Sequence, residues 1–186
     1  MKGIFLALES LGLKPVLLAY AAILVAHELE EWNIAAFERR HFEGLPACHG
    51  DESARGVIFL VSALALAFGL GALLAPSESA AALVFFPLAA FSATNSAQHL
   101  YWATRFRAYA PGLVSAAFLL PGTFLISAWA LSRGSLPAWY LGFLALLSSG
   151  ALVATLVDGR RMPKAVQVAY ALGARIASLL GPRGKA

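Results

Sequence analysis

Five long apolar segments, separated by short polar stretches, dominate the pattern of hydrophobic and polar positions along the chain. Each is close to the roughly 20 residues that an α-helix needs to cross the hydrocarbon core of a bilayer. Prolines inside the third and fourth segments can bend a helix without excluding a span. The pattern therefore predicts spans at about residues 15–32, 56–75, 79–102, 111–131 and 137–157.

The two ends of the chain carry amphipathic segments instead of apolar ones. Residues 1–12 predict a short interfacial segment that leads into the first span. Residues 162–180 are apolar on one face and basic at intervals, which is typical of a helix lying on the membrane surface. A short sixth span is the alternative for residues 162–180.

Composition places the chain among membrane proteins. Of its 186 residues, 60% are hydrophobic and 13% are charged, whereas soluble domains carry about a quarter charged residues. The mean hydropathy is +0.73. We therefore expect an all-α fold, a polytopic membrane helical bundle that forms a single transmembrane domain over residues 1–186. The lone Cys48 excludes an intrachain disulfide.

The basic residues are distributed unevenly between the two sides that five spans define. Three of the 14 Lys and Arg residues lie on the side of the N-terminus, and the other eleven lie on the opposite side. The positive-inside rule then places the N-terminus outside and the C-terminus in the cytoplasm, as in a multi-pass protein of the cytoplasmic membrane. This asymmetry accounts for the net charge of +4, so that charge is no evidence for a nucleic-acid partner.

Ionisable residues cluster at the end of the first span, in the stretch HELEEW at residues 27–32. The uncharged run of residues 15–26 covers only about 18 Å of a hydrocarbon core that is roughly 30 Å thick. His27, Glu30 and Glu31 are therefore expected at membrane depth, where ionisable groups are costly and mark functional sites. Their spacing places all three on one helix face, where they form half of a metal site. A solvated helix end is the alternative, and it follows if the span begins several residues earlier.

A second polar cluster, Asn95, Gln98 and His99, lies at the end of the third span. Because the first and third spans both run from outside to inside, the two clusters are expected at the same depth, near the cytoplasmic leaflet. Asn95 and His99 share a helix face, and facing helices build the buried metal sites of bundles. Imidazole, carboxylate and amide ligands without a thiolate suit one or two ions of iron, zinc or manganese. Interhelical hydrogen bonding is the alternative role for Asn95 and His99.

Further polar residues follow the first span. Glu38 and His41 continue the helical stripe that begins at His27, and His49 follows in the next loop. A straight helix would place His41 about 21 Å from His27, so one metal cluster cannot use both. We therefore interpret Glu38 and His41 as second-site or substrate-facing residues, below the five residues named above as ligands. An ordinary loop histidine is the alternative for His41 and His49.

Three motifs together resemble the HXXEE-domain family of small bacterial integral membrane proteins. They are His27-x-x-Glu30-Glu31, Asn95-x-x-x-His99, and Arg107-Ala108-Tyr109-Ala110-Pro111-Gly112. The resemblance implies a bacterial inner-membrane protein whose polar residues form a metal-dependent site, and it implies no established reaction. Arg107 and Tyr109, near the start of the fourth span, are candidate substrate contacts.

Two functional hypotheses follow. The first is a membrane metalloenzyme, either oxidoreductase or hydrolase, that acts on a lipid or another apolar small molecule at the cytoplasmic leaflet. Iron would support oxygen-dependent hydroxylation or desaturation, and zinc would support hydrolysis. In the hydrolytic version, Glu30 or Glu31, whichever is not a ligand, is the general base.

The second hypothesis is a proton- or metal-ion-coupled transporter that uses the buried His/Glu cluster. The small size of the chain and the lack of an inverted repeat weigh against it. A purely structural site that ties the first and third spans together is a third interpretation. Membrane lipids are the expected surroundings in each case, and the sequence leaves the oligomeric state open, a homo-oligomer included.

Overall fold

The structure of the chain is a computed structural model that describes residues 10–158 and 160–180. Within these residues it is all-α, as predicted, and the only β-type pairing is an isolated bridge between Glu43 and Arg161. The interfacial segment predicted at residues 1–12 falls almost entirely outside the described residues. The helices are α2 (Leu13–Glu30), the 3-10 turn η1 (Glu31–Asn33), α3 (Ile34–His41), α4 (Asp51–Leu74), α5 (Glu78–Phe106), α6 (Leu113–Ser132), α7 (Ala138–Asp158) and α8 (Lys164–Leu180).

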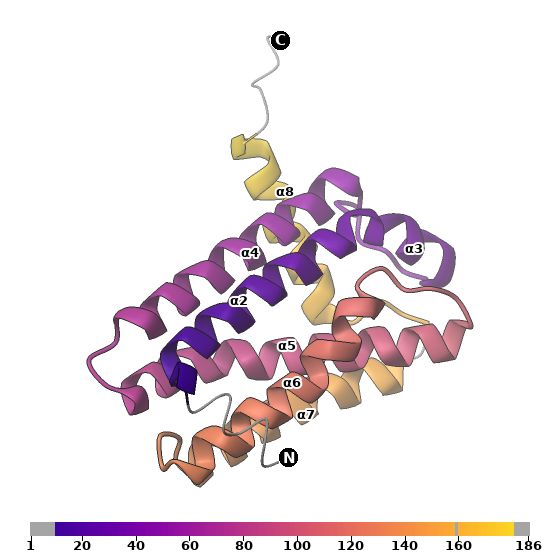
Figure 1. Cartoon of the computed structure of the whole chain (residues 1–186). Coiled ribbons are helices and arrows are strands. Elements are labelled where there is room, and N and C mark those ends of the chain that lie inside the picture. Colours follow the sequence, from indigo (N-terminus) through magenta and orange to yellow (C-terminus); the bar gives the residue numbers. More distant parts are fainter. Residues whose placement is uncertain (1–9, 159, 181–186) are drawn as a thin grey trace.

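Five long helices lie alongside one another and an amphipathic helix crosses them (Figure 1). α2 packs against α4 and α6, while α5 packs against α4, α6 and α7. The contacts of α5 on three sides make it the central helix of the bundle. α8 turns back after α7 and packs on α4.

Four helices of the described chain, α4 to α7, are long and apolar enough to cross a membrane. They correspond to four of the five predicted spans. α2 carries Lys14, Glu28 and Glu30 within its 18 residues, and these charges set it apart from the four. Its inner face is nevertheless fully buried, with no exposure at Leu17 or Leu24.

The interior is divided into two apolar clusters, one toward each end of the bundle. The first fills the space between α2, α5 and α6 around Phe85 and Trp129. The second surrounds Trp102 near the C-terminal end of α5, and it includes Phe37 of α3 and Tyr170 of α8. The polar residues predicted to form a site project from α2 and α5 at the level where these two clusters meet.

α8 lies so close to α4 that only glycines fit at the crossing. A Cβ on Gly56 would come within 2.1 Å of the Gly173 carbonyl oxygen, and a Cβ on Gly173 would meet the Ser53 oxygen at 2.2 Å. Close approach of this kind holds α8 against the start of α4. The other face of α8 leaves apolar side chains such as Val168 and Leu179 exposed, as expected of a helix that also contacts a membrane surface.

Candidate metal centre

The site begins where α2 ends. The regular helix stops at Glu30, and residues 31–33 form a tighter 3-10 turn, so that α3 continues in a new direction. His27 and Glu31, one turn apart, still point to the same side, with the His27 Nε2 atom 2.9 Å from Glu31 Oε1. The His27 side chain is fully buried, and that of Glu31 is 12% exposed.

α5 supplies the facing half of the site, as the sequence predicts. His99 places its Nε2 atom 2.8 Å from Glu31 Oε1, and Asn95 donates from Nδ2 to the same oxygen over 3.1 Å. One ligand atom each from His27, Glu31 and His99 lies within 4.8 Å of the others, so this group could hold a metal ion. Rotation of the Asn95 amide by 180° would place its oxygen where Nδ2 lies, 3.0 Å from His27 Nε2.

The His99 imidazole fits a bound cation better than it fits a hydrogen-bonded pair. Its side chain is 1% exposed, and neither of its ring nitrogens makes a well-aligned hydrogen bond within the described chain, although Nε2 lies close to the Glu31 carboxylate. Buried polar atoms without a partner are rare and costly. Two imidazole nitrogens and a carboxylate oxygen form a donor set that suits zinc, iron or manganese, and a cation at their meeting point would give His99 Nε2 a partner.

A chain of hydrogen bonds determines which nitrogen of His27 faces the site. Ser115, on the first turn of α6, donates its single hydroxyl proton to Glu30 Oε2 over 2.5 Å. The 2.7 Å contact between His27 Nδ1 and Ser115 Oγ must then use a proton on Nδ1. Nε2 is therefore left with a lone pair that points at Glu31 and His99, the tautomer that a metal ligand requires.

Glu30, predicted as a ligand or as the general base, lies outside the group that could hold a metal. Its carboxylate accepts hydrogen bonds from the backbone N–H groups of Val114 and Ser115 at 3.0 and 2.9 Å. It thereby caps the N-terminus of α6, where a negative charge is favoured. Tyr109 also donates its hydroxyl proton to Glu30, and this bond raises the pKa of Tyr109 to about 12.

Gly112 brings the backbone of the loop between α5 and α6 against both imidazoles. Its φ of +90° lies in the left-handed region that favours glycine. A Cβ at this position would meet His27 Cε1 at 2.9 Å and His99 Cε1 at 3.1 Å. The turn noted in the sequence at residues 109–112 therefore closes one side of the site.

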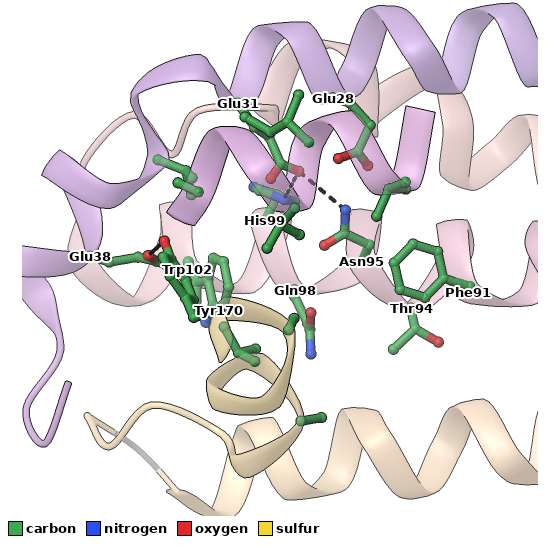
Figure 2. A pocket seen from close by; sticks show the side chains of 18 of the residues that line it. Glu28, Glu31, Glu38, Phe91, Thr94, Asn95, Gln98, His99, Trp102 and Tyr170 are labelled. Carbon is green, nitrogen blue, oxygen red and sulfur yellow. Dashed lines mark hydrogen bonds and ion pairs between the residues drawn. The ribbon is translucent and has the colours of Figure 1, made fainter. Parts of the chain in front are cut away.

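A cavity of about 250 Å³ lies on another side of the site, and Glu31, Asn95 and His99 contribute to its wall (Figure 2). Glu28 also lines it, and Figure 2 shows its carboxylate beside Glu31 and Asn95. The Glu28 side chain is 2% exposed, yet no described residue forms a hydrogen bond or ion pair with it. The cavity therefore contains a buried carboxylate without a partner, next to the candidate ligands.

The remaining predicted residues lie apart from His27, Glu31 and His99, which we call the metal group. Glu38 lines the same cavity and pairs through Oε2 with His49 Nε2 at 2.9 Å. His41 bonds through Nδ1 to the Phe37 carbonyl and does not line the cavity. Arg107 is exposed at the C-terminal end of α5, also outside the cavity wall. The structure thus brings together four of the predicted residues, His27, Glu31, Asn95 and His99.

Sequence reasoning missed Glu28, Ser115 and the packing role of Gly112. Glu28 had a signal, because His27-Glu28-x-x-Glu31 resembles the H-E-x-x-H pattern, in which the residue after the first histidine is the general base of a metalloprotease. Ser115 had none, since a serine in an apolar segment is common and only the fold places it beside His27.

Comparison with known proteins identifies the family. Residues 18–126 match the sequence model of a family described as "Protein of unknown function with HXXEE motif", and the chain belongs to this family. The match includes every residue of the metal group and also Glu30, Gly112 and Ser115. No curated protein and no solved structure matches the chain.

Substitution of Gly112 by alanine should lower the metal content of the protein. The new Cβ requires both a strained positive φ and displacement of two imidazoles, so we expect the metal content of the purified protein to fall severalfold. Elemental analysis of the detergent-purified protein measures this. Gly134→Ala is the matched control, because Gly134 also has a positive φ, +67°, but no atom lies within 4 Å of its Cβ position. Equal metal loss in the two variants would show that backbone strain alone is responsible.

Substitution of Ser115 by alanine should weaken metal binding without emptying the site. The change removes the acceptor for His27 Nδ1 and leaves the backbone bonds to Glu30 intact, and loss of such a supporting contact costs about 10–100-fold in metal affinity. Titration against a competing chelator measures the affinity. Ser127→Ala, on the same helix, removes a hydroxyl that bonds only to the Thr123 carbonyl and should leave the affinity unchanged.

Proposed function

We propose that this member of the HXXEE family is a membrane metalloenzyme that hydrolyses an apolar substrate with a single divalent cation held by His27, Glu31 and His99. One observation carries the proposal. The three ligand atoms lie close together, two of the ligands, Glu31 and His99, line a mostly apolar cavity, and the wall of that cavity also presents the unpartnered carboxylate of Glu28. Ligands, a base and room for a substrate are therefore present at one place.

The arrangement favours one metal ion over two. Glu30 is engaged by α6, and His41 bonds to its own helix, so neither is available to bridge a second ion. Two histidines and one glutamate are the ligands of zinc peptidases such as thermolysin. A zinc ion bound by such a set supplies a Lewis acid that polarises the substrate and activates water. Asn95 is placed either to act as a fourth ligand or to hold Glu31 by its amide.

Glu28 takes the role of general base that the sequence assigned to Glu30 or Glu31. Glu31 is committed to the metal group, and the Glu30 oxygens accept bonds from Tyr109 and α6. Glu28 alone among these three has no partner and faces the cavity. It would take a proton from the attacking water and return that proton to the leaving group, so that water is added across the broken bond.

The proposed orientation of the protein in the membrane determines which leaflet lies next to the metal group. With α2 as a fifth span, the N-terminus outside and the C-terminus in the cytoplasm, the metal group lies near the cytoplasmic leaflet of a bacterial inner membrane. The buried face of α2 supports its place in the membrane, because Leu13, Leu17 and Leu24 have no exposed surface. A lipid or another apolar molecule in that leaflet would be within reach of the cavity.

Two alternatives use the same residues. Two histidines and a carboxylate also form the facial triad of non-haem iron oxygenases, so iron in place of zinc would favour oxidation. A transporter would need a polar path to the outer side of the bundle. In the described residues that region is filled by the apolar cluster around Phe85 and Trp129, which supports the enzyme over the transporter.

Histidine substitutions test the metal centre. We expect about one iron or zinc ion per chain in the purified protein, and its loss in His27→Ala and His99→Ala variants that remain folded. His41→Ala is the control and should retain the ion, because His41 does not belong to the group. Elemental analysis and thermal unfolding in detergent provide the measurements. The proposal fails if no ion binds under any loading condition, and unfolding of both variants would favour a structural role.

Substitution of Glu28 by glutamine separates catalysis from metal binding. The variant should keep its metal and lose about 10²–10⁴-fold in the rate of hydrolysis, because the proton acceptor is gone. The rate would be followed on nitrophenyl esters of increasing acyl-chain length. Glu52→Gln removes an exposed carboxylate from the first turn of α4 and should leave the rate unchanged. An undiminished rate in Glu28→Gln would remove Glu28 from the mechanism.

A further inference from the structure

The cavity beside the metal group extends along α5. Its wall on α5 extends from Phe91 to Trp102, and eleven helical steps between them cover about 16 Å. A volume of about 250 Å³ along this length is enough for one unbranched chain. His99, between these two ends, places the metal group partway along the cavity, so a bound chain would pass the metal group.

The charges in the cavity wall are all of one sign. Glu28, Glu31 and Glu38 line it, and no lysine or arginine does so among the described residues. At the Glu38 end, apart from the metal group, the wall offers a fatty acid or a phosphate no basic partner, whereas a cation would be attracted to the Glu38 carboxylate.

The Glu38 carboxylate can accept a further hydrogen bond from a ligand in the cavity. Its side chain is buried, and its Oε2 atom accepts bonds from Tyr170 and His49. Its Oε1 atom has no donor in the part of the chain that the structure describes. Arg39, the next residue along α3, is paired with Asp51 Oδ1 at 2.9 Å and is not available to Glu38. A ligand that donates a charged hydrogen bond would complete this end of the cavity.

The surroundings of Glu38 favour an amine over other donors. Trp102 and Tyr170 line the same end of the cavity, and aromatic rings attract cations. Burial and the Glu38 carboxylate raise the pKa of Tyr170 well above its usual range, so the phenol keeps its proton and stays a donor to Glu38. The opposite end is apolar, with Val61, Phe91 and Ala151 in the wall.

We propose that this cavity binds a single-chain amphiphile with a protonated amine, the amine at Glu38 and the apolar chain toward Phe91. The geometry then places a part of the molecule between its amine and the end of its chain at the metal group. The identification of this molecule as a substrate rests on the proposed function, whereas its binding does not. The binding site therefore can be tested without metal and without turnover.

The experiment compares three probes with the same 12-carbon chain, namely dodecylamine, dodecanol and dodecanoate. Protein in lipid nanodiscs is titrated with each probe, with and without a chelator, and bound probe is counted by native mass spectrometry. We expect dodecylamine to bind one per chain and at least tenfold more tightly than the other two probes. Glu38→Gln should abolish this preference. Glu43→Gln, which removes an exposed carboxylate, is the control and should retain it.

The outcomes separate this proposal from the metalloenzyme. Preference for dodecylamine in protein that never binds metal would support the amine site and overturn the proposed function alone. Equal binding of dodecylamine and dodecanol, or tighter binding of dodecanoate, would overturn the amine site and leave the metal centre standing. If Glu38→Gln does not fold, the order of the three probes on the unaltered protein still decides the question.

Discussion

The carboxylate of Glu30 joins the end of α2 to the start of α6, and the geometry of the candidate metal centre depends on this contact. Glu30 accepts two backbone N–H bonds from α6 and the hydroxyl proton of Ser115. Because Ser115 gives its proton to Glu30, it can only accept from His27, and His27 must turn Nε2 toward α5. A capping interaction at a helix end therefore also sets the tautomer of a buried imidazole. This gives Glu30, named in the family motif, a defined role without metal ligation.

The interruption of the helix at residues 31–33 links the metal centre to the far end of the cavity. A 3-10 turn redirects the chain after Glu31, and α3 then carries Glu38 into the wall of the same cavity. Without that turn, a straight helix would continue past the bundle end. The result is a cavity with candidate metal ligands partway along it and a partly engaged carboxylate at its end. α8 completes the wall with Tyr170, held in place by the close approach of Gly173 to α4.

Three glutamates in one largely apolar cavity would be costly for a purely structural site. Buried carboxylates usually have a partner, and Glu28 has none in the described chain. Such a cost is tolerated where the charges serve a ligand, a metal ion or a reaction. The burial of Glu28, the free Oε1 atom of Glu38 and the lack of a well-aligned hydrogen bond at the His99 ring nitrogens are consistent with a site that is completed by what it binds.

The sequence by itself determined the helical class, four of the five predicted helices that could cross a membrane, and the two polar clusters that form the candidate metal group. These follow from apolar length and from the period of 3.6 residues, which are local properties of the chain. The sequence could not assign different roles to Glu28, Glu30 and Glu31. Neighbouring side chains on a helix diverge by about 100°, so which carboxylate meets a ligand, a helix end or a cavity depends on the elements packed around it. Only the tertiary structure decided this, because α6, α5 and the cavity each approach α2 from a different side.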